Sequence, residues 1–134
     1  AKTTSEIDRV LIPRGYVAIS NATKEDIMQN EMFNFFLSAK EIELQRMPYE
    51  REVISNFQAH GFRLVDNTTI DQIFANNYSG FYEKVRQRGL SVLRLVSDSD
   101  FEDGLTKFKQ YCETKPNNAK VYEQFHLFTF QKEK

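Results

Sequence analysis

The side chains best suited to catalysis are few and scattered along this chain. Its histidines are His60 and His126, and its single cysteine is Cys112. Zinc sites need several such ligands, usually in closely spaced pairs, so the sequence predicts no metal site. Cys112 falls on the apolar side of an expected helix, where a thiol is usually buried and unreactive. Packing roles are expected for both histidines, and no catalytic residue is assigned.

Basic residues near the middle of the chain stand beside aromatic ones, a mixture suited to phosphate pairing and base stacking. The basic residues are Lys84, Arg86, Arg88 and Arg94, and the aromatic neighbours are Tyr78, Phe81 and Tyr82. Acidic residues are interspersed with them, and the formal net charge of the chain is −1. A solvated helix face is therefore the preferred interpretation, and no nucleic-acid partner is expected.

A candidate ligand-binding set combines two polar residues with two tyrosines. Asn21 and Thr23 directly follow the first expected strand. Ligands of open α/β sheets bind beyond the carboxyl ends of the strands, so these side chains are expected at such a rim. Tyr78 and Tyr82 offer apolar surface plus a hydroxyl group. The alternative roles are a helix cap for Thr23 and ordinary packing for the tyrosines.

The first expected elements are a short helix, a turn and a strand. Thr3 and Glu6 form a capping-box pattern at the start of the helix, and Pro13 ends it. Gly15 permits the chain to reverse. Residues 16–19 are apolar without alternation, which is typical of a strand covered on both faces.

Helices and strands continue to the end of the chain. Thr23 and Asp26 form a second capping-box pattern, and Gly61 marks a helix end. The last strand has apolar residues on both faces, which favours a place inside the sheet. The expected elements are helices at 24–37, about 48–60, 81–88 and 100–113, a helical tendency at 90–96, a loop or extended piece at 38–46, a turn at 116–118, and strands at 62–69 and 125–131.

Two segments of this order resemble a known family. Residues 9–20 place a helix ending in Arg-Val-Leu before a proline–glycine turn and a buried strand. This resembles the segment around the fifth strand of class I S-adenosylmethionine-dependent methyltransferases, where the turn is Pro-Gly-Gly; here Arg14 replaces the first glycine. Residues 47–65 are similar to the helix that leads into Ala-Gly-Phe and the sixth strand, with His60 in place of a small residue. The strand at 125–131 would be the seventh.

The resemblance implies an α/β chain with a partial Rossmann-like methyltransferase fold, in a single domain over residues 1–134. Its sheet would be small, mixed and three-stranded, flanked by helices, with strand order first, third, second. A helical insertion at about 70–119 would precede the last, antiparallel strand. Asn21, Thr23, Tyr78 and Tyr82 would then lie beside a small-molecule methyl acceptor.

The glycine-rich cofactor loop of that family has no counterpart here. The glycines are Gly15, Gly61, Gly80, Gly89 and Gly104, and no two are closer than nine residues. A GxG turn against a charged cofactor group is therefore impossible. We expect the C-terminal, acceptor-side half of an enzyme that binds S-adenosylmethionine when complete, with no cofactor and no activity in this chain alone. The alternative is a stand-alone ligand-binding or protein-interaction module that shares this part of the fold.

Composition limits the remaining possibilities. The chain is 40% hydrophobic and 28% charged, as globular proteins are. No apolar run approaches the roughly 20 residues that span a bilayer, so no membrane partner is expected. A single cysteine suits a reducing compartment, and the cytoplasm is the expected location. The first strand would lack its neighbour, which predicts a homodimer through the exposed strand edge.

Overall fold

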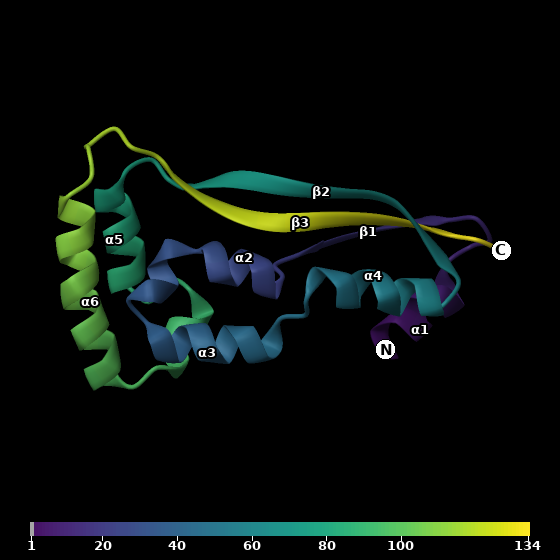
Figure 1. Ribbon diagram of the computed structural model, residues 1–134, viewed down its shortest axis with the longest axis horizontal. Helices are drawn as coiled ribbons and strands as arrows, with labels where there is room; N and C mark the ends of the chain where they lie inside the picture. The colour runs from purple at the N-terminus through teal and green to yellow at the C-terminus, as the bar shows by residue number, and fades with distance from the viewer. Residues whose placement is uncertain (1) are drawn as a thin grey trace.

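A three-stranded sheet runs the length of the molecule, with the helices on one of its faces (Figure 1). The computed structural model describes residues 2–134. The strands are β1 (Tyr16–Asn21), β2 (Phe62–Ala75) and β3 (Val121–Lys132), in the order β1-β3-β2. This order confirms that the last strand lies between the other two. Both pairings are antiparallel. The expected mixed sheet is therefore wrong, because β1 and β2 run in the same direction but are separated by β3.

The helices form two groups beneath the sheet. In Figure 1, α1 and α4 lie near one end, whereas α2, α3, α5 and α6 gather toward the other, which is the carboxyl end of β1. The helical elements are α1 (Lys2–Val10), α2 (Lys24–Gln29), the 3-10 helix η1 (Glu31–Asn34), α3 (Leu37–Arg46), α4 (Glu50–Ala59), α5 (Tyr78–Arg86), the 3-10 helix η2 (Ser91–Leu95) and α6 (Asp98–Glu113).

β1 is covered on one face only, so the expected burial of both faces is wrong. Val17 and Ile19 pack against the core beneath the sheet. Tyr16 and Ala18 point to the open face, where Tyr16 is 61% exposed. The helices all lie on the opposite side, and this arrangement leaves the open face to solvent.

The N-terminal turns differ in detail from their expected form. α1 already includes Thr3, so this residue does not cap the helix, and Glu6 pairs with Arg9 instead. Arg14, with φ 65°, adopts the left-handed conformation of the turn. Gly15 is required for space, because a Cβ there would lie 2.9 Å from the Ile12 carbonyl oxygen.

The expected helix at 24–37 is interrupted at Asn30. The Thr23–Asp26 capping box is confirmed. Asn30 then takes an extended conformation, and its side chain accepts a hydrogen bond from the Met32 N–H. Such a local bond competes with helix continuation. The break lets Met32 enter the core at 0% exposure.

Residues 38–46 are helical, so the expected loop there is wrong. α3 begins at Leu37 and buries Ala39, with Ile42 and Leu44 half-buried against the core. Its weak periodicity is compensated by these tertiary contacts. The strands are also longer than expected, since β2 extends to Ala75 and β3 begins at Val121. The helical insertion consequently occupies residues 76–120.

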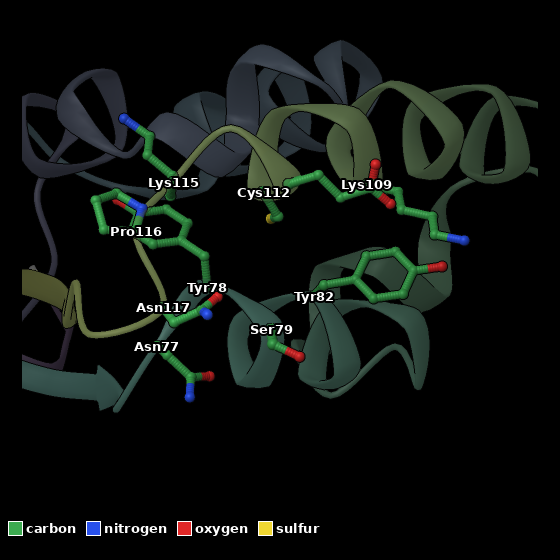
Figure 2. Close-up of a pocket in the computed structure, with 10 residues that line it drawn as sticks. Asn77, Tyr78, Ser79, Tyr82, Lys109, Cys112, Lys115, Pro116 and Asn117 are labelled. Carbon is green, nitrogen blue, oxygen red and sulfur yellow. The ribbon is translucent and has the colours of Figure 1, made fainter.

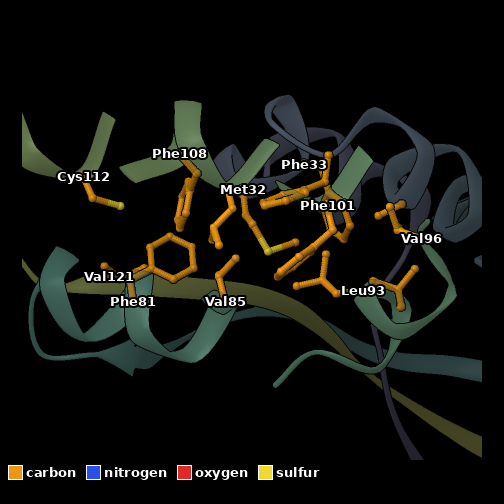
Figure 3. Close-up of a cluster of buried hydrophobic side chains, with 14 of the residues drawn as sticks. Met32, Phe33, Phe81, Val85, Leu93, Val96, Phe101, Phe108, Cys112 and Val121 are labelled. Atoms are coloured by element: carbon orange, nitrogen blue, oxygen red, sulfur yellow. The ribbon is translucent and has the colours of Figure 1, made fainter. Parts of the chain in front are cut away.

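The core has two parts. The smaller lies between α4 and the sheet and contains Val53, Phe57, Phe62, Phe128 and Phe130. The larger joins the helices of the insertion to η1 and α3, and is rich in phenylalanine (Figure 3). α6 approaches this region closely at Gly104, where a Cβ would lie 2.3 Å from the Phe35 carbonyl oxygen.

Candidate functional site

Asn21 and Thr23 stand at the carboxyl end of β1, and their environments differ. Asn21 is exposed and pairs with His126 on β3. Thr23 is fully buried and donates hydrogen bonds from its N–H and its hydroxyl to Asp26 Oδ2, at 2.9 and 3.0 Å. Thr23 therefore fills the helix-cap role given above as its alternative.

A buried carboxylate–imidazole pair lies beside this cap. His126 Nδ1 is 2.8 Å from Asp26 Oδ2. Both residues are buried, since His126 is 7% exposed and Asp26 is 5% exposed. Because an ionised carboxylate only accepts hydrogen bonds, Nδ1 donates. On the other side of the ring, Nε2 is 3.6 Å from Glu50 Oε2. The pair ties α2 to the central strand at the carboxyl end of β1.

Sequence reasoning assigned His126 to packing and missed its partner. The two residues are 100 positions apart, so no local spacing connects them. The available signals were a capping-box aspartate and a histidine on the inward face of a central strand. Neither signal points to the other residue unless the strand order is known.

Tyr78 belongs to a second polar cluster, formed with Glu31 and Tyr111. The Tyr78 hydroxyl donates to Glu31 Oε1 at 2.6 Å, and the Tyr111 hydroxyl donates to the other oxygen of this carboxylate. Burial, followed by the hydrogen bond to Glu31, raises the pKa of Tyr78 far above its usual value and also raises the pKa of Tyr111. Both hydroxyls therefore stay protonated near neutral pH. The cluster joins η1, α5 and α6.

A cavity of about 550 Å³ opens between α5 and α6 (Figure 2). We call it the α5–α6 cavity; its lining includes Tyr78, Ser79, Tyr82, Lys109, Cys112 and Lys115. Both tyrosines of the candidate set therefore line one cavity, whereas Asn21 and Thr23 are not part of its wall.

Cys112 contributes a neutral thiol to this wall. Burial, reinforced by the Glu31 carboxylate, raises the pKa of this thiol to about 11. The expected buried thiol is confirmed. A protonated thiol is a poor nucleophile, so Cys112 shapes the cavity and is not a candidate for covalent chemistry.

A second cavity, of about 280 Å³, lies between the helices and the covered face of the sheet. Asp26, Glu31, Tyr78 and Gln124 are among its lining residues. Tyr78 thus lines both cavities. Asp26 is hydrogen-bonded to Thr23, which follows β1, and Tyr78 belongs to the helical insertion. This cavity therefore lies between the end of β1 and the insertion.

Three members of the basic cluster of residues 84–94 make local contacts. Arg86 pairs with Glu83, and Arg88 pairs with Asp98 at 2.7 Å. The Arg88 guanidinium also lies 4.2 Å from the centroid of the Phe101 ring. Lys84 donates to the Phe74 carbonyl oxygen. These contacts favour the solvated-face interpretation.

A metal site and a membrane span each place a requirement on residues 2–134. Among residues 2–134, no three His, Cys, Asp or Glu side chains are placed to hold a metal ion together. Over the same residues, no helix combines the length and apolar character needed to cross a bilayer.

Comparison with known proteins adds no assignment. The chain matches no protein-family model and no curated protein. The function must therefore be argued from the topology, the cavities and the sequence resemblance.

Proposed function

We propose that this chain is the C-terminal, acceptor-side portion of an S-adenosylmethionine-dependent methyltransferase that acts on a small molecule. The observation that carries the proposal is the strand order β1-β3-β2, with an antiparallel strand in the middle. The resemblance of residues 9–20 and 47–65 implies this order for the fifth, seventh and sixth strands. The strand order is therefore consistent with the family that the sequence pattern suggests.

The position of the cavities gives further support. Ligands of open α/β sheets bind beyond the carboxyl ends of the strands. The helical insertion lies at this end of β1 (Figure 1). Asp26, which follows β1, and Tyr78, which belongs to the insertion, line the same cavity. In the proposed enzyme, Tyr78 and Tyr82 contact the acceptor, Thr23 acts through Asp26 as a positioning residue, and Asn21 lies at the rim.

The residues of this chain do not fit S-adenosylmethionine itself. Gly104 packs against Phe35 and Phe36, and Gly61, with φ 81°, ends α4. Neither belongs to a loop that could approach a charged cofactor group. The cofactor therefore belongs to another half of the complete enzyme, and we assign no transfer step to this chain alone.

Titration calorimetry of S-adenosylmethionine into the purified chain is expected to give no saturable heat. The natural gene product that contains this chain is expected to transfer a labelled methyl group from the same cofactor to a small molecule of a cell extract. Saturable micromolar binding by the isolated chain would contradict the proposal. So would a natural product that leaves every small-molecule fraction unlabelled.

A stand-alone ligand-binding or protein-interaction module is the second candidate. The α5–α6 cavity favours it, because this cavity is formed without any cofactor-binding half. A natural product that consists of these residues only, and that binds a ligand without methylating it, would select this candidate.

The two edges of the sheet differ in a way that predicts a partner for β1. The β2 edge carries charged residues such as Asp66 and Asp71 and two register shifts, which are common protections against strand pairing. β1 has no charge, no proline and no bulge. Next to it, Ile12 is 72% exposed and Val10 is also exposed. In the complete enzyme, a strand of the cofactor-binding half would cover this edge.

In the isolated chain, we expect a second copy to pair with β1 in antiparallel fashion. A twofold axis at Ala18 places Val17 opposite Ile19 of the second copy and keeps both helical layers on one side of a continuous sheet. Sedimentation velocity at about 100 μM is expected to show a dimer, since unprotected edges of this kind associate. Ala18→Glu should give monomers through like-charge repulsion at the axis.

Thr68→Glu is the matched control for this prediction. Thr68 is exposed on β2 and pairs with Leu127, so the same charge is introduced at the other edge. The variant should remain dimeric. A monomeric parent chain, or equal dissociation by both variants, would contradict pairing through β1.

A further inference from the structure

The α5–α6 cavity contains two ammonium groups without a carboxylate partner. Lys109 and Lys115 both line it. Within residues 2–134, neither takes part in an ion pair. Lys115 lies over the uncharged rings of Tyr111 and Tyr78, at 4.8 and 5.5 Å from their centroids. The remaining charged residue of the lining is Glu113, which is exposed, as is Lys109, so the lining carries two positive side chains and one negative side chain. The lining is therefore positive overall.

Other charges lie close to this lining. The Glu31 carboxylate is outside it and accepts hydrogen bonds from the Tyr78 and Tyr111 hydroxyls. The Cys112 thiol is neutral, because burial raises its pKa to about 11. The first turn of α5 and the last turn of α6 both border the cavity. Their dipoles present opposite signs, so the side chains determine the preference for a ligand.

The walls of the α5–α6 cavity are suited to contact with a flat aromatic ring. Small-molecule sites have volumes of roughly 300–1,000 Å³ and a few polar groups on an apolar lining; this cavity has about 550 Å³. Tyr78 and Tyr82 supply aromatic surface, Ser79 supplies a hydroxyl group, and Figure 2 shows the Cys112 thiol directed into the gap between the helices. At one end of the cavity, the Tyr82 hydroxyl and the Lys109 ammonium extend to the same side (Figure 2).

We propose that the α5–α6 cavity binds a small aromatic carboxylate. The carboxylate pairs with Lys109 beside the Tyr82 hydroxyl, and the ring lies against the tyrosines. Lys115 adds positive potential at the other end. The identification of this ligand as the methyl acceptor rests on the proposed function. The prediction that the cavity binds it does not.

Benzoate titrated into the ¹⁵N-labelled chain tests the site by NMR. We expect saturable shifts of the amides of residues 77–82, 109–115 and 117, with a Kd of about 1 mM, as a ligand of this size permits. Benzyl alcohol and benzylamine, which keep the ring without the negative charge, should bind at least about tenfold more weakly, because they lose the charge-assisted hydrogen bond.

Lys109→Gln should weaken benzoate binding by about tenfold, because it removes the same charge-assisted hydrogen bond to the carboxylate. Lys107→Gln is the matched control, since Lys107 is an exposed lysine of the same helix and is not part of the lining. Absence of saturable shifts up to about 20 mM, well above the expected Kd, would overturn the proposal. Equal binding of benzylamine, or an equal effect of Lys107→Gln, would also overturn it.

The results separate this inference from the proposed function. Benzoate binding together with a natural product that transfers no methyl group would support the site and contradict the methyltransferase. Methyl transfer without benzoate binding would contradict the ligand class alone.

Discussion

Replacing Phe108 with alanine is expected to lower the free energy of unfolding by about 3–5 kcal/mol, as large-to-small changes of buried aromatic residues do. The Phe108 ring is 0% exposed. Its centroid lies 5.0 Å from that of Phe81, 5.4 Å from Phe35 and 6.1 Å from Phe36. It thus joins α6 to α5 and to the segment after η1 (Figure 3). Alanine would leave a cavity where these three segments meet.

Urea denaturation followed by circular dichroism measures this loss. Leu37→Ala is the control, because Leu37 is a large apolar residue that is 68% exposed; its effect should stay within about 0.5 kcal/mol. If both variants lost the same stability, Phe108 would not hold the helical layer together in the way described.

Asp26→Ala is expected to cost about 2–5 kcal/mol, because it leaves a buried imidazole nitrogen without its hydrogen-bond partner and breaks a helix cap. The substitution also removes the acceptor of two hydrogen bonds from Thr23. His126 would remain buried against the Phe128 ring, 5.6 Å away between centroids, without a partner for Nδ1. The measurement is again urea denaturation.

A double-mutant cycle isolates the pair from the helix cap. His126→Phe alone leaves the Thr23–Asp26 bonds in place and should cost less than Asp26→Ala. The double variant, with Asp26→Ala and His126→Phe, should lose about 1–3 kcal/mol less stability than the two single variants lose together, as coupled buried groups do. Strictly additive losses would show that Asp26 acts only as a cap.

Local signals predicted the elements whose ends are determined by a few residues. The Thr23–Asp26 capping box, the glycine end of α4 at Gly61 and the turn at 116–118 depend on short-range hydrogen bonds and on backbone conformation. The break at Asn30 could not be predicted by apolar spacing, because a side-chain bond to Met32 competes with the helix. α3 has a weak pattern of its own and is helical through packing on the core.

The candidate site shows the same division. Tyr78 and Tyr82 are four residues apart on α5 and line one cavity, as neighbours on one helix face do, although the helix expected from the sequence begins only at residue 81. The opposite wall comes from α6, and the carboxylate that holds Tyr78 comes from Glu31. Contacts between residues this far apart depend on how whole helices pack, and the spacing of the residues in the sequence does not indicate this packing.

The central position of β3 has a consequence for synthesis on the ribosome. Both strand pairings of the described residues involve β3, so no part of the sheet can form until residues 121–132 have left the exit tunnel. β1 is made roughly a hundred residues before β3, at about 5–20 residues per second, and it stays unpaired for that time unless a strand of an upstream cofactor-binding half covers it. Nascent chains without that half are therefore expected to need protection of this one strand, and a chaperone that binds short apolar segments is expected to bind at Tyr16–Asn21.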